Sequence, residues 1–441
     1  MFFKNLMEGV KMPDLRKKIL ITLGLLLVYR IGAFIPVPGI DPSYFGYRMG
    51  ETGASDFLGI LNSLAGGALA NGAILALGVG PYITSSIVMQ LLTIAIPSLE
   101  RLSKQGEEGR RKIAVYTRYV ALFMALAQSI AIVVSLGVGG QISSSLFGDI
   151  PQAVTAILVI LTLTTGAMFT VWIGDKITEH GIGNGMSMLI FIGIVSTGVA
   201  AFYSSIVGIF NADAADLGSA IATPIVFIVV LTLIFFAVVF VDLAERRIPV
   251  TYAKQVKGNK MYGGQNANIP IKINAVGVIP IIFAFSILNF PQLIMSMVAP
   301  NSGAMAWYSA NMGTGTWPNI VLTALLILGF SYFYASLSFN PDDVAKQIQQ
   351  NGGFILGFRP GIPTRDYLKK VHNRITLFGA IFLMLMALVP AIIFRAAMGT
   401  ENPLTNAFTG IAILITVSVA LEFDKQIQAQ MLMKSYKGFL K

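Results

Sequence analysis

Ten long apolar runs, separated by segments that hold nearly all the charge, dominate the 441-residue sequence. Each run is near the length of about 20 residues that a helix needs to cross the hydrocarbon core of a bilayer. Apolar and polar residues do not alternate along them, as they would in the strands of a membrane barrel. Charged residues make up 12% of the chain, against roughly 25% in soluble domains, so a water-soluble globule is excluded. The runs lie at 19–35, 74–95, 113–136, 151–173, 182–210, 221–241, 273–298, 320–339, 375–397 and 404–421.

Lys and Arg fall on one side of the membrane if the N-terminus is cytoplasmic. In that orientation 27 of the 31 basic residues lie in inside segments. Because cytoplasmic loops are enriched in Lys and Arg, we expect both termini in the cytoplasm. Five runs precede residue 211 and five follow it, and since five is odd, the second half enters from the opposite side. If the halves 1–210 and 211–441 are structural repeats, they are inverted, with a working site between them.

Catalysis is not expected. The chain has no Cys, and its two histidines, His180 and His372, lie far apart in predicted cytoplasmic segments. No phosphate-binding loop is present, and we expect neither a metal nor a cofactor. All 21 acidic residues fall outside the apolar runs, which argues against a proton-coupled transporter or an acidic selectivity ring. Arg30 is the one basic residue well inside a run, and we expect it to extend toward the outer surface.

Residues 56–70 form an apolar segment that is too short to span a bilayer and is interrupted by Gly66 and Gly67. Two interpretations remain open. The segment is either an amphipathic helix on the outer surface or a re-entrant plug in a funnel, because such a piece survives at membrane depth only inside protein or a wet cavity.

Neutral polar residues and two Gly/Pro motifs stand out within the runs. Gln90, Gln128 and Asn274 indicate either hydrogen bonds between helices or a polar seam between helices that separate. Pro81 and Pro280 each follow a glycine-containing stretch early in a run. Proline bends helices, so the pattern predicts one kinked helix in each half, as a hinge or as an ordinary kink.

Two predicted cytoplasmic loops, 242–272 and 340–374, are long and rich in basic residues. Loops above about 12–15 residues tend to be functional. Their charge suits either anionic lipid or a large anionic or RNA-containing partner.

Several motifs, in order along the chain, resemble the SecY family, the channel-forming subunits of the bacterial Sec protein translocon. The first is Arg30-Ile31-Gly32 followed by Ile35-Pro36-Val37-Pro38-Gly39-Ile40. Two longer ones run from Ala76 to Leu92 and from Trp172 to Gly185. Shorter matches lie at 106–112, 274–280, 339–341 and 358–361.

The resemblance implies an all-α membrane protein with ten transmembrane helices in two inverted five-helix halves. These surround an hourglass pore closed by a short re-entrant plug helix, with a lateral gate between the second and seventh spans. The family's pore ring matches Val79, Ile83, Ile190, Ile282 and Ile415. Its plug matches Asp56, Phe57, Leu58, Ile60, Leu61 and Leu64. Gate positions match Gln90, Gln128 and Asn274, and partner-docking positions match Arg246, Arg247, Lys254, Lys257, Lys260 and Arg359.

The family further implies a protein-conducting channel that catalyses no reaction. It moves unfolded preproteins across the bacterial plasma membrane and releases transmembrane segments sideways into lipid. Expected partners are SecE-like and SecG-like small membrane subunits, the SecA motor ATPase, the ribosome, signal peptides, preproteins and membrane lipids. The alternative is an inverted-repeat secondary transporter of a small solute, which would need ion-coordinating groups at depth.

Overall fold

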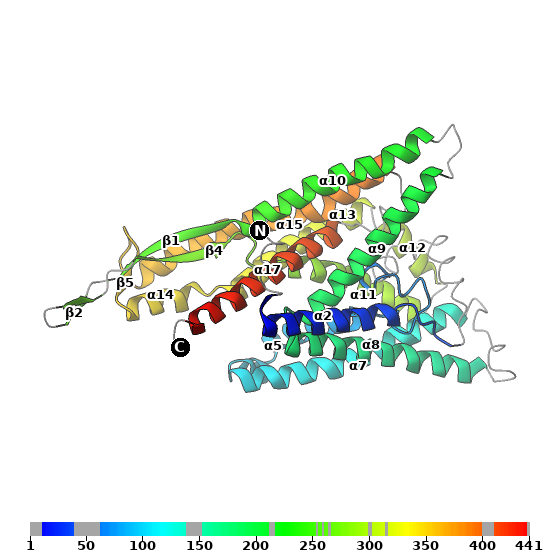
Figure 1. The fold of residues 1–441 in the computed structure, drawn as a ribbon, viewed down its shortest axis with the longest axis horizontal. Helices are drawn as coiled ribbons and strands as arrows, with labels where there is room; N and C mark the ends of the chain where they lie inside the picture. Colours follow the sequence, from blue (N-terminus) through cyan, green and yellow to red (C-terminus); the bar gives the residue numbers. More distant parts are fainter. Residues whose placement is uncertain are drawn as a thin grey trace.

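The computed structural model describes residues 11–38, 62–137, 152–210, 217–252, 255–257, 260–262, 266–298, 302–313, 316–398 and 410–438. The chain there is mostly helical, with a small region of strands at one end (Figure 1). In that view α2, α7 and α8 lie along the lower side, α10 and α15 along the upper side, and α9 runs obliquely between them.

A helix covers part of each predicted run. In the first half these are α2 (Pro13–Gly32), α5 (Gly80–Ala95), α7 (Glu107–Gly137), α8 (Gln152–His180) and α9 (Gly185–Phe210). In the second half they are α10 (Leu217–Leu243), α11 (Ile279–Val298), α13 (Trp317–Ser338), α15 (Ile362–Met398) and α17 (Gly410–Gly438). Three shorter helices, which the sequence did not predict, are α6 (Pro97–Ser103), α12 (Gly303–Met312) and α14 (Pro341–Gln350).

Six helices in the described part of the chain are long and apolar enough to cross a membrane, or seven if α5 and α6 form one broken span. Only 28% to 44% of their apolar windows is buried inside the protein. On α10, for example, Phe236 and Phe240 are 65% and 77% exposed. Such continuous apolar surface indicates contact with lipid, and the protein is a multi-pass membrane protein.

The prolines of the second and seventh runs start helices, so the prediction of kinks is wrong. Pro81 lies in the first turn of α5, and Pro280 is the second residue of α11. Proline suits this position because its missing N–H would have no helical partner there. Gly78 and Gly277, with φ of 52° and 65°, supply the left-handed turn that redirects the chain before each helix.

The sharp bend lies instead between α5 and α6, whose axes differ by 105°. Ile96 is extended, with ψ of 113°. The cause is Pro97, because a proline ring disfavours helical geometry in the residue before it.

The Trp172–Gly185 motif forms a tight turn from α8 to α9. Its glycines permit the close approach, since a Cβ on Gly185 would lie 1.8 Å from the Gly174 carbonyl oxygen. The Gly185 N–H donates to Thr178 Oγ1 at 2.8 Å, and Ile182 N–H donates to Thr22 Oγ1 of α2 at 3.1 Å. The turn therefore anchors three helices at one point.

The two loops predicted to be cytoplasmic form antiparallel strands, which corrects the all-α prediction. The strands are β1 (Glu245–Tyr252), β2 (Gln255–Lys257), β3 (Lys260–Tyr262), β4 (Asn266–Lys272) and β5 (Gly353–Phe354). One sheet has the order β4-β1-β5, and β2 pairs with β3. Ile248 and Val250 alternate with exposed residues along β1, as in a strand with one buried face.

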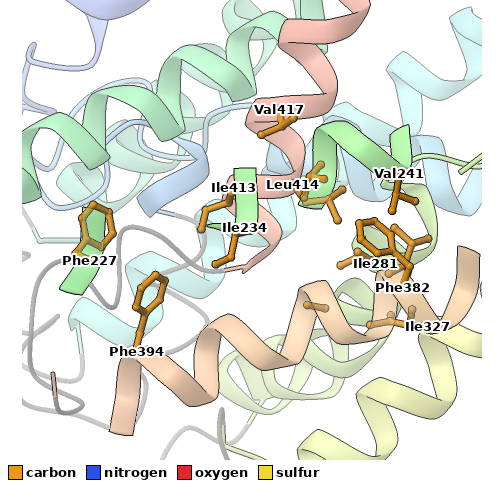
Figure 2. Packing of buried hydrophobic residues seen from close by; sticks show 14 of the residues in the cluster. Phe227, Ile234, Val241, Ile281, Ile327, Phe382, Phe394, Ile413, Leu414 and Val417 are labelled. Atoms are coloured by element: carbon orange, nitrogen blue, oxygen red, sulfur yellow. The ribbon is translucent and has the colours of Figure 1, made fainter. Parts of the chain in front are cut away.

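Three large apolar clusters hold the helices together. One joins α7 and α8 to residues 69–77. A second joins α9 to α10, α11, α13, α15 and α17, with Phe227 and Phe394 at one end (Figure 2). The third draws on helices of both halves, and it holds the candidate site.

Candidate functional site

Aliphatic side chains from four helices meet in the third cluster. Val79 caps α5 and Ile83 lies one turn later, while Ile190, Ile282 and Ile415 come from α9, α11 and α17. All five belong to this one cluster, with Val79, Ile190 and Ile415 buried and Ile83 and Ile282 partly buried. The structure thus brings the five predicted ring positions together.

Leu64 packs against the same cluster and begins a compact, turn-rich segment that runs to Val79. The segment lies inside the protein, since Ala65, Ala68 and Leu69 are at most 2% exposed. Residues 62–70 therefore do not form a helix on the outer surface. Asp56, Phe57, Leu58, Ile60 and Leu61 lie outside the described residues.

Gly193 of α9 lets this segment lie flat against the helix. A Cβ at Gly193 would lie 2.5 Å from the Leu64 carbonyl oxygen. One turn further along α9, Thr197 Oγ1 lies 3.5 Å from Ser63 Oγ. Ile190, Gly193 and Thr197 are spaced three and four residues apart, so they share one face of α9. That spacing is the signal by which Gly193 and Thr197 could have been found from the sequence.

Arg30 holds the segment from the other side. Its Nη1 donates a hydrogen bond to the Gly66 carbonyl oxygen, and its guanidinium lies 4.6 Å from the centroid of the Phe34 ring. The sequence predicted that Arg30 extends outward. It turns inward instead because Gly66, with φ of 70°, presents its carbonyl at this point.

The predicted gate residues occupy three different environments. Gln90, exposed on α5, accepts a hydrogen bond from the Tyr334 hydroxyl of α13 at 3.1 Å. Beside it Ile87 of α5 packs with Phe283 of α11 and Tyr334 in a small apolar cluster. Gln128 is 6% exposed on α7, which packs against α11.

Asn274 lies apart from this contact. Its Nδ2 donates to Asp242 Oδ1 at the end of α10, at 2.8 Å. In the described residues, α5 thus meets α11 and α13 through the apolar side chains of Ile87, Phe283 and Tyr334, with the Gln90–Tyr334 hydrogen bond beside them. Nothing in the sequence predicts the contact made by Tyr334, because its hydrogen-bond partner Gln90 lies 244 residues away.

The two loops 242–272 and 340–374 pack together. Thr251 and Tyr252 of β1 pair with Phe354 and Gly353 of β5. Beneath this sheet an apolar cluster joins β1 and β4 to α14 and the start of α15, with Ile248, Val250, Ile271, Ala345, Ile348, Ile355 and Leu368 buried. Three of the predicted docking residues, Arg246, Arg247 and Arg359, therefore belong to one packed body.

Four of the predicted docking residues lie on the strands, and a fifth, Lys254, is outside the described residues. Arg246 and Arg247 are exposed on β1, where Arg247 Nε donates to Glu245 Oε1 at 2.7 Å. Lys257 and Lys260 face each other in the register of β2 and β3.

Arg359 is exposed on a short loop with a defined shape. Gly357 and Gly361 flank it with φ of 86° and 101°, and Phe358 stacks on Tyr367 at 4.2 Å between ring centroids. The Thr364 hydroxyl donates to the Arg359 carbonyl oxygen at 2.8 Å. The Arg359 guanidinium makes no ion pair within the described part of the chain.

Solved structures of similar shape are protein-conducting channels. One, described as the structure of a protein conducting channel, has a TM-score of 0.63 at 20% identity and covers 94% of this chain and 92% of its own. Sec61 from the canine ribosome-channel complex has a TM-score of 0.61 at 19% identity, with the same coverage. At this identity the likeness establishes the fold, which is that of a protein-conducting channel.

Sequence comparison gives the family. The SecY family model matches residues 73–423. The protein translocase subunit SecY of Streptomyces scabiei is 42% identical, over 98% of this chain and 99% of its own length. That of Mycobacterium tuberculosis is 40% identical over the same shares. The chain belongs to the SecY family. The predictions of a non-enzymatic protein-conducting channel are confirmed, and the secondary transporter is not favoured.

Proposed function

We propose that this chain forms a ten-span pore between two inverted halves, 1–210 and 211–441, closed by the five-residue ring and by a plug at 56–70. One observation carries the proposal. Branched aliphatic side chains from α5, α9, α11 and α17, which belong to both halves, pack in one cluster with Leu64 of the plug segment. A ring built from both halves is what a pore on a pseudo-twofold axis requires.

The ring acts as a seal because a narrow apolar constriction excludes water, and ions do not pass without their hydration shells. The plug segment adds a second layer, since residues 62–70 are packed beneath α2 and α9 through Arg30 and Gly193. Opening for a preprotein requires both layers to separate.

Lateral release fits the contact between α5 and α11. The Ile87, Phe283 and Tyr334 cluster is apolar. When the apolar core of a signal peptide, about 7–15 residues long, inserts here, the apolar contacts between the helices are exchanged for apolar contacts with the peptide. Gln90 and Tyr334 contribute one hydrogen bond, and such bonds between membrane helices are worth only about 0.6–2 kcal/mol.

Partners dock on the cytoplasmic body. Arg359 and Arg246 are exposed on one packed body, and β2 and β3 add Lys257 and Lys260 to the same basic loop; this charge suits ribosomal RNA or the carboxylates of the SecA motor ATPase. The known structures of Sec61 in a ribosome-channel complex and of the Ssh1 complex bound to the yeast 80S ribosome support the ribosome. SecE-like and SecG-like subunits complete the translocon in the plasma membrane, with both termini cytoplasmic.

The test of the seal is a double substitution, Ile83→Gly with Ile282→Gly, reconstituted in planar bilayers. We expect a higher resting ion conductance at near-normal expression, because shortening the side chains wets the constriction. The matched control is Ile281→Gly, since Ile281 is the buried neighbour on α11 that faces the second cluster (Figure 2). It should lower stability by a few kcal/mol without a leak. Unchanged conductance in a folded double variant would refute the ring.

A further inference from the structure

A small cavity lies where the start of α11 meets α13 and α15. Lys272, Asn274, Ser331, His372 and Gly379 are among the residues that line it. It offers about 10 Å³ to the centre of a water molecule, and by this measure one water needs roughly 10–15 Å³.

Three residues that line this cavity each carry a buried polar atom with no hydrogen-bond partner among the described residues: Asn274 Oδ1, Ser331 Oγ and His372 Nδ1. Their side chains come from three different elements, and Asn274, Ser331 and His372 are 9%, 2% and 5% exposed. A buried polar atom without a hydrogen-bond partner destabilises the folded protein. Three of them around one cavity indicate a common ligand.

The neighbouring hydrogen bonds define what that ligand must offer. Asn274 Nδ2 donates to the Asp242 carboxylate, so its other atom, Oδ1, is an acceptor. His372 Nε2 lies 3.1 Å from the Ala335 carbonyl oxygen, which only accepts, so in the neutral ring Nδ1 is also an acceptor. The Ser331 hydroxyl is left to donate.

We propose that one ordered water molecule binds here. It donates its two protons to Asn274 Oδ1 and His372 Nδ1 and accepts the Ser331 hydroxyl, which satisfies all three atoms. A buried water typically makes about three such bonds.

The water joins the base of α11 to the rest of the second half. Asn274 connects it to α10 through Asp242, Ser331 to α13, and His372 to α15. Gly379 of α15 lies close to the same strand-to-helix connection, because a Cβ there would be 2.6 Å from the Ile273 carbonyl oxygen. If α11 is the gate helix of the proposed function, the bound water couples the N-terminal end of α11 to α13 and α15, so that the three move together. The binding of water does not depend on that role.

Solid-state NMR of protein labelled with ¹⁵N-histidine tests the site directly. The chain has only two histidines, so His180→Gln leaves His372 as the single imidazole signal. We expect the neutral ring with the proton on Nε2, and magnetisation transfer from a bound water to Nδ1. A proton on Nδ1, or no water contact at that atom, would overturn the proposal.

A double-mutant cycle tests the bridge. Ser331→Ala removes one arm, and His372→Gln removes the Nδ1 acceptor while its amide still reaches the Ala335 carbonyl. Each should lower the thermal midpoint, and the pair should lower it by less than the sum. Ser336→Ala, on the exposed face of α13, is the matched control and should add to His372→Gln. Additive effects of Ser331→Ala and His372→Gln would refute a shared ligand.

Discussion

Arg30 is expected to determine how firmly residues 62–73 are held. Replacing it by Met keeps an unbranched apolar stem but removes the hydrogen bond to the Gly66 carbonyl and the contact with Phe34. A hydrogen bond to a charged group is worth about 1.5–3 kcal/mol, and a partly exposed cation–π contact about 0.5–1 kcal/mol. Because Arg30 is half-buried, we take the lower end, ~2 kcal/mol.

That energy corresponds to a roughly 30-fold larger undocked fraction of the segment, since 1.4 kcal/mol is about a factor of ten. Amide hydrogen exchange read by mass spectrometry measures this fraction directly. The reporting amides are those of Gly67 and Ala73, which donate to the Asn62 and Ala68 carbonyl oxygens at 2.8 and 2.9 Å. We expect their exchange to accelerate about 30-fold in Arg30→Met.

The matched control is Arg118→Met, which breaks a partly exposed ion pair between Arg118 of α7 and Asp175 of α8, at 2.8 Å. Exposed pairs contribute about 0–1 kcal/mol, and this one joins α7 to α8 rather than to residues 62–73, so the exchange of that segment should not change. If Arg30→Met leaves the exchange of residues 62–73 within about threefold of wild type, the guanidinium does not hold them.

Three further outcomes are expected. Arg359→Glu should impair translocation without loss of thermal stability, and Arg359→Lys should restore only part of it, because an ammonium lacks the planar fork; normal secretion would reject this docking role. In the Cys-free chain, an impermeant maleimide added to intact cells should label Trp317→Cys but not Leu356→Cys. The opposite labelling pattern would show that the predicted topology is inverted. Gly193→Ala should lower the thermal midpoint, because its Cβ would lie 2.5 Å from the Leu64 carbonyl oxygen.

The membrane-embedded helices follow from local sequence. A stretch such as 221–241 has no charge to solvate, and in lipid its backbone must satisfy its own hydrogen bonds, so a helix is the outcome whatever its neighbours are. Family motifs placed the ring residues, and the structure brings these five into contact. Their role as a seal stays a prediction.

Helix ends and loops were predicted less well. Pro81 and Pro280 were interpreted as kinks because proline bends a helix that continues through it. Both instead begin a helix, since the preceding chain turns at Gly78 and Gly277. The strands were missed although β1 pairs mainly with β4 of the same loop, because the short alternation at Ile248 and Val250 is the only strand pattern in β1. The pairing of β1 with β5 spans about 100 residues of sequence and has no local signal.

The sequence by itself determined the class of protein, because length, apolarity and the distribution of Lys and Arg are properties of the chain that need no neighbour. Tertiary structure alone decided which polar groups meet. Arg30 finds the Gly66 carbonyl, Gln90 finds Tyr334, and Asn274 finds Asp242. These partners lie between 32 and 244 residues apart. A buried donor bonds to whichever acceptor the packing of helices brings within about 3 Å. The local sequence around the donor or around the acceptor does not predict that geometry.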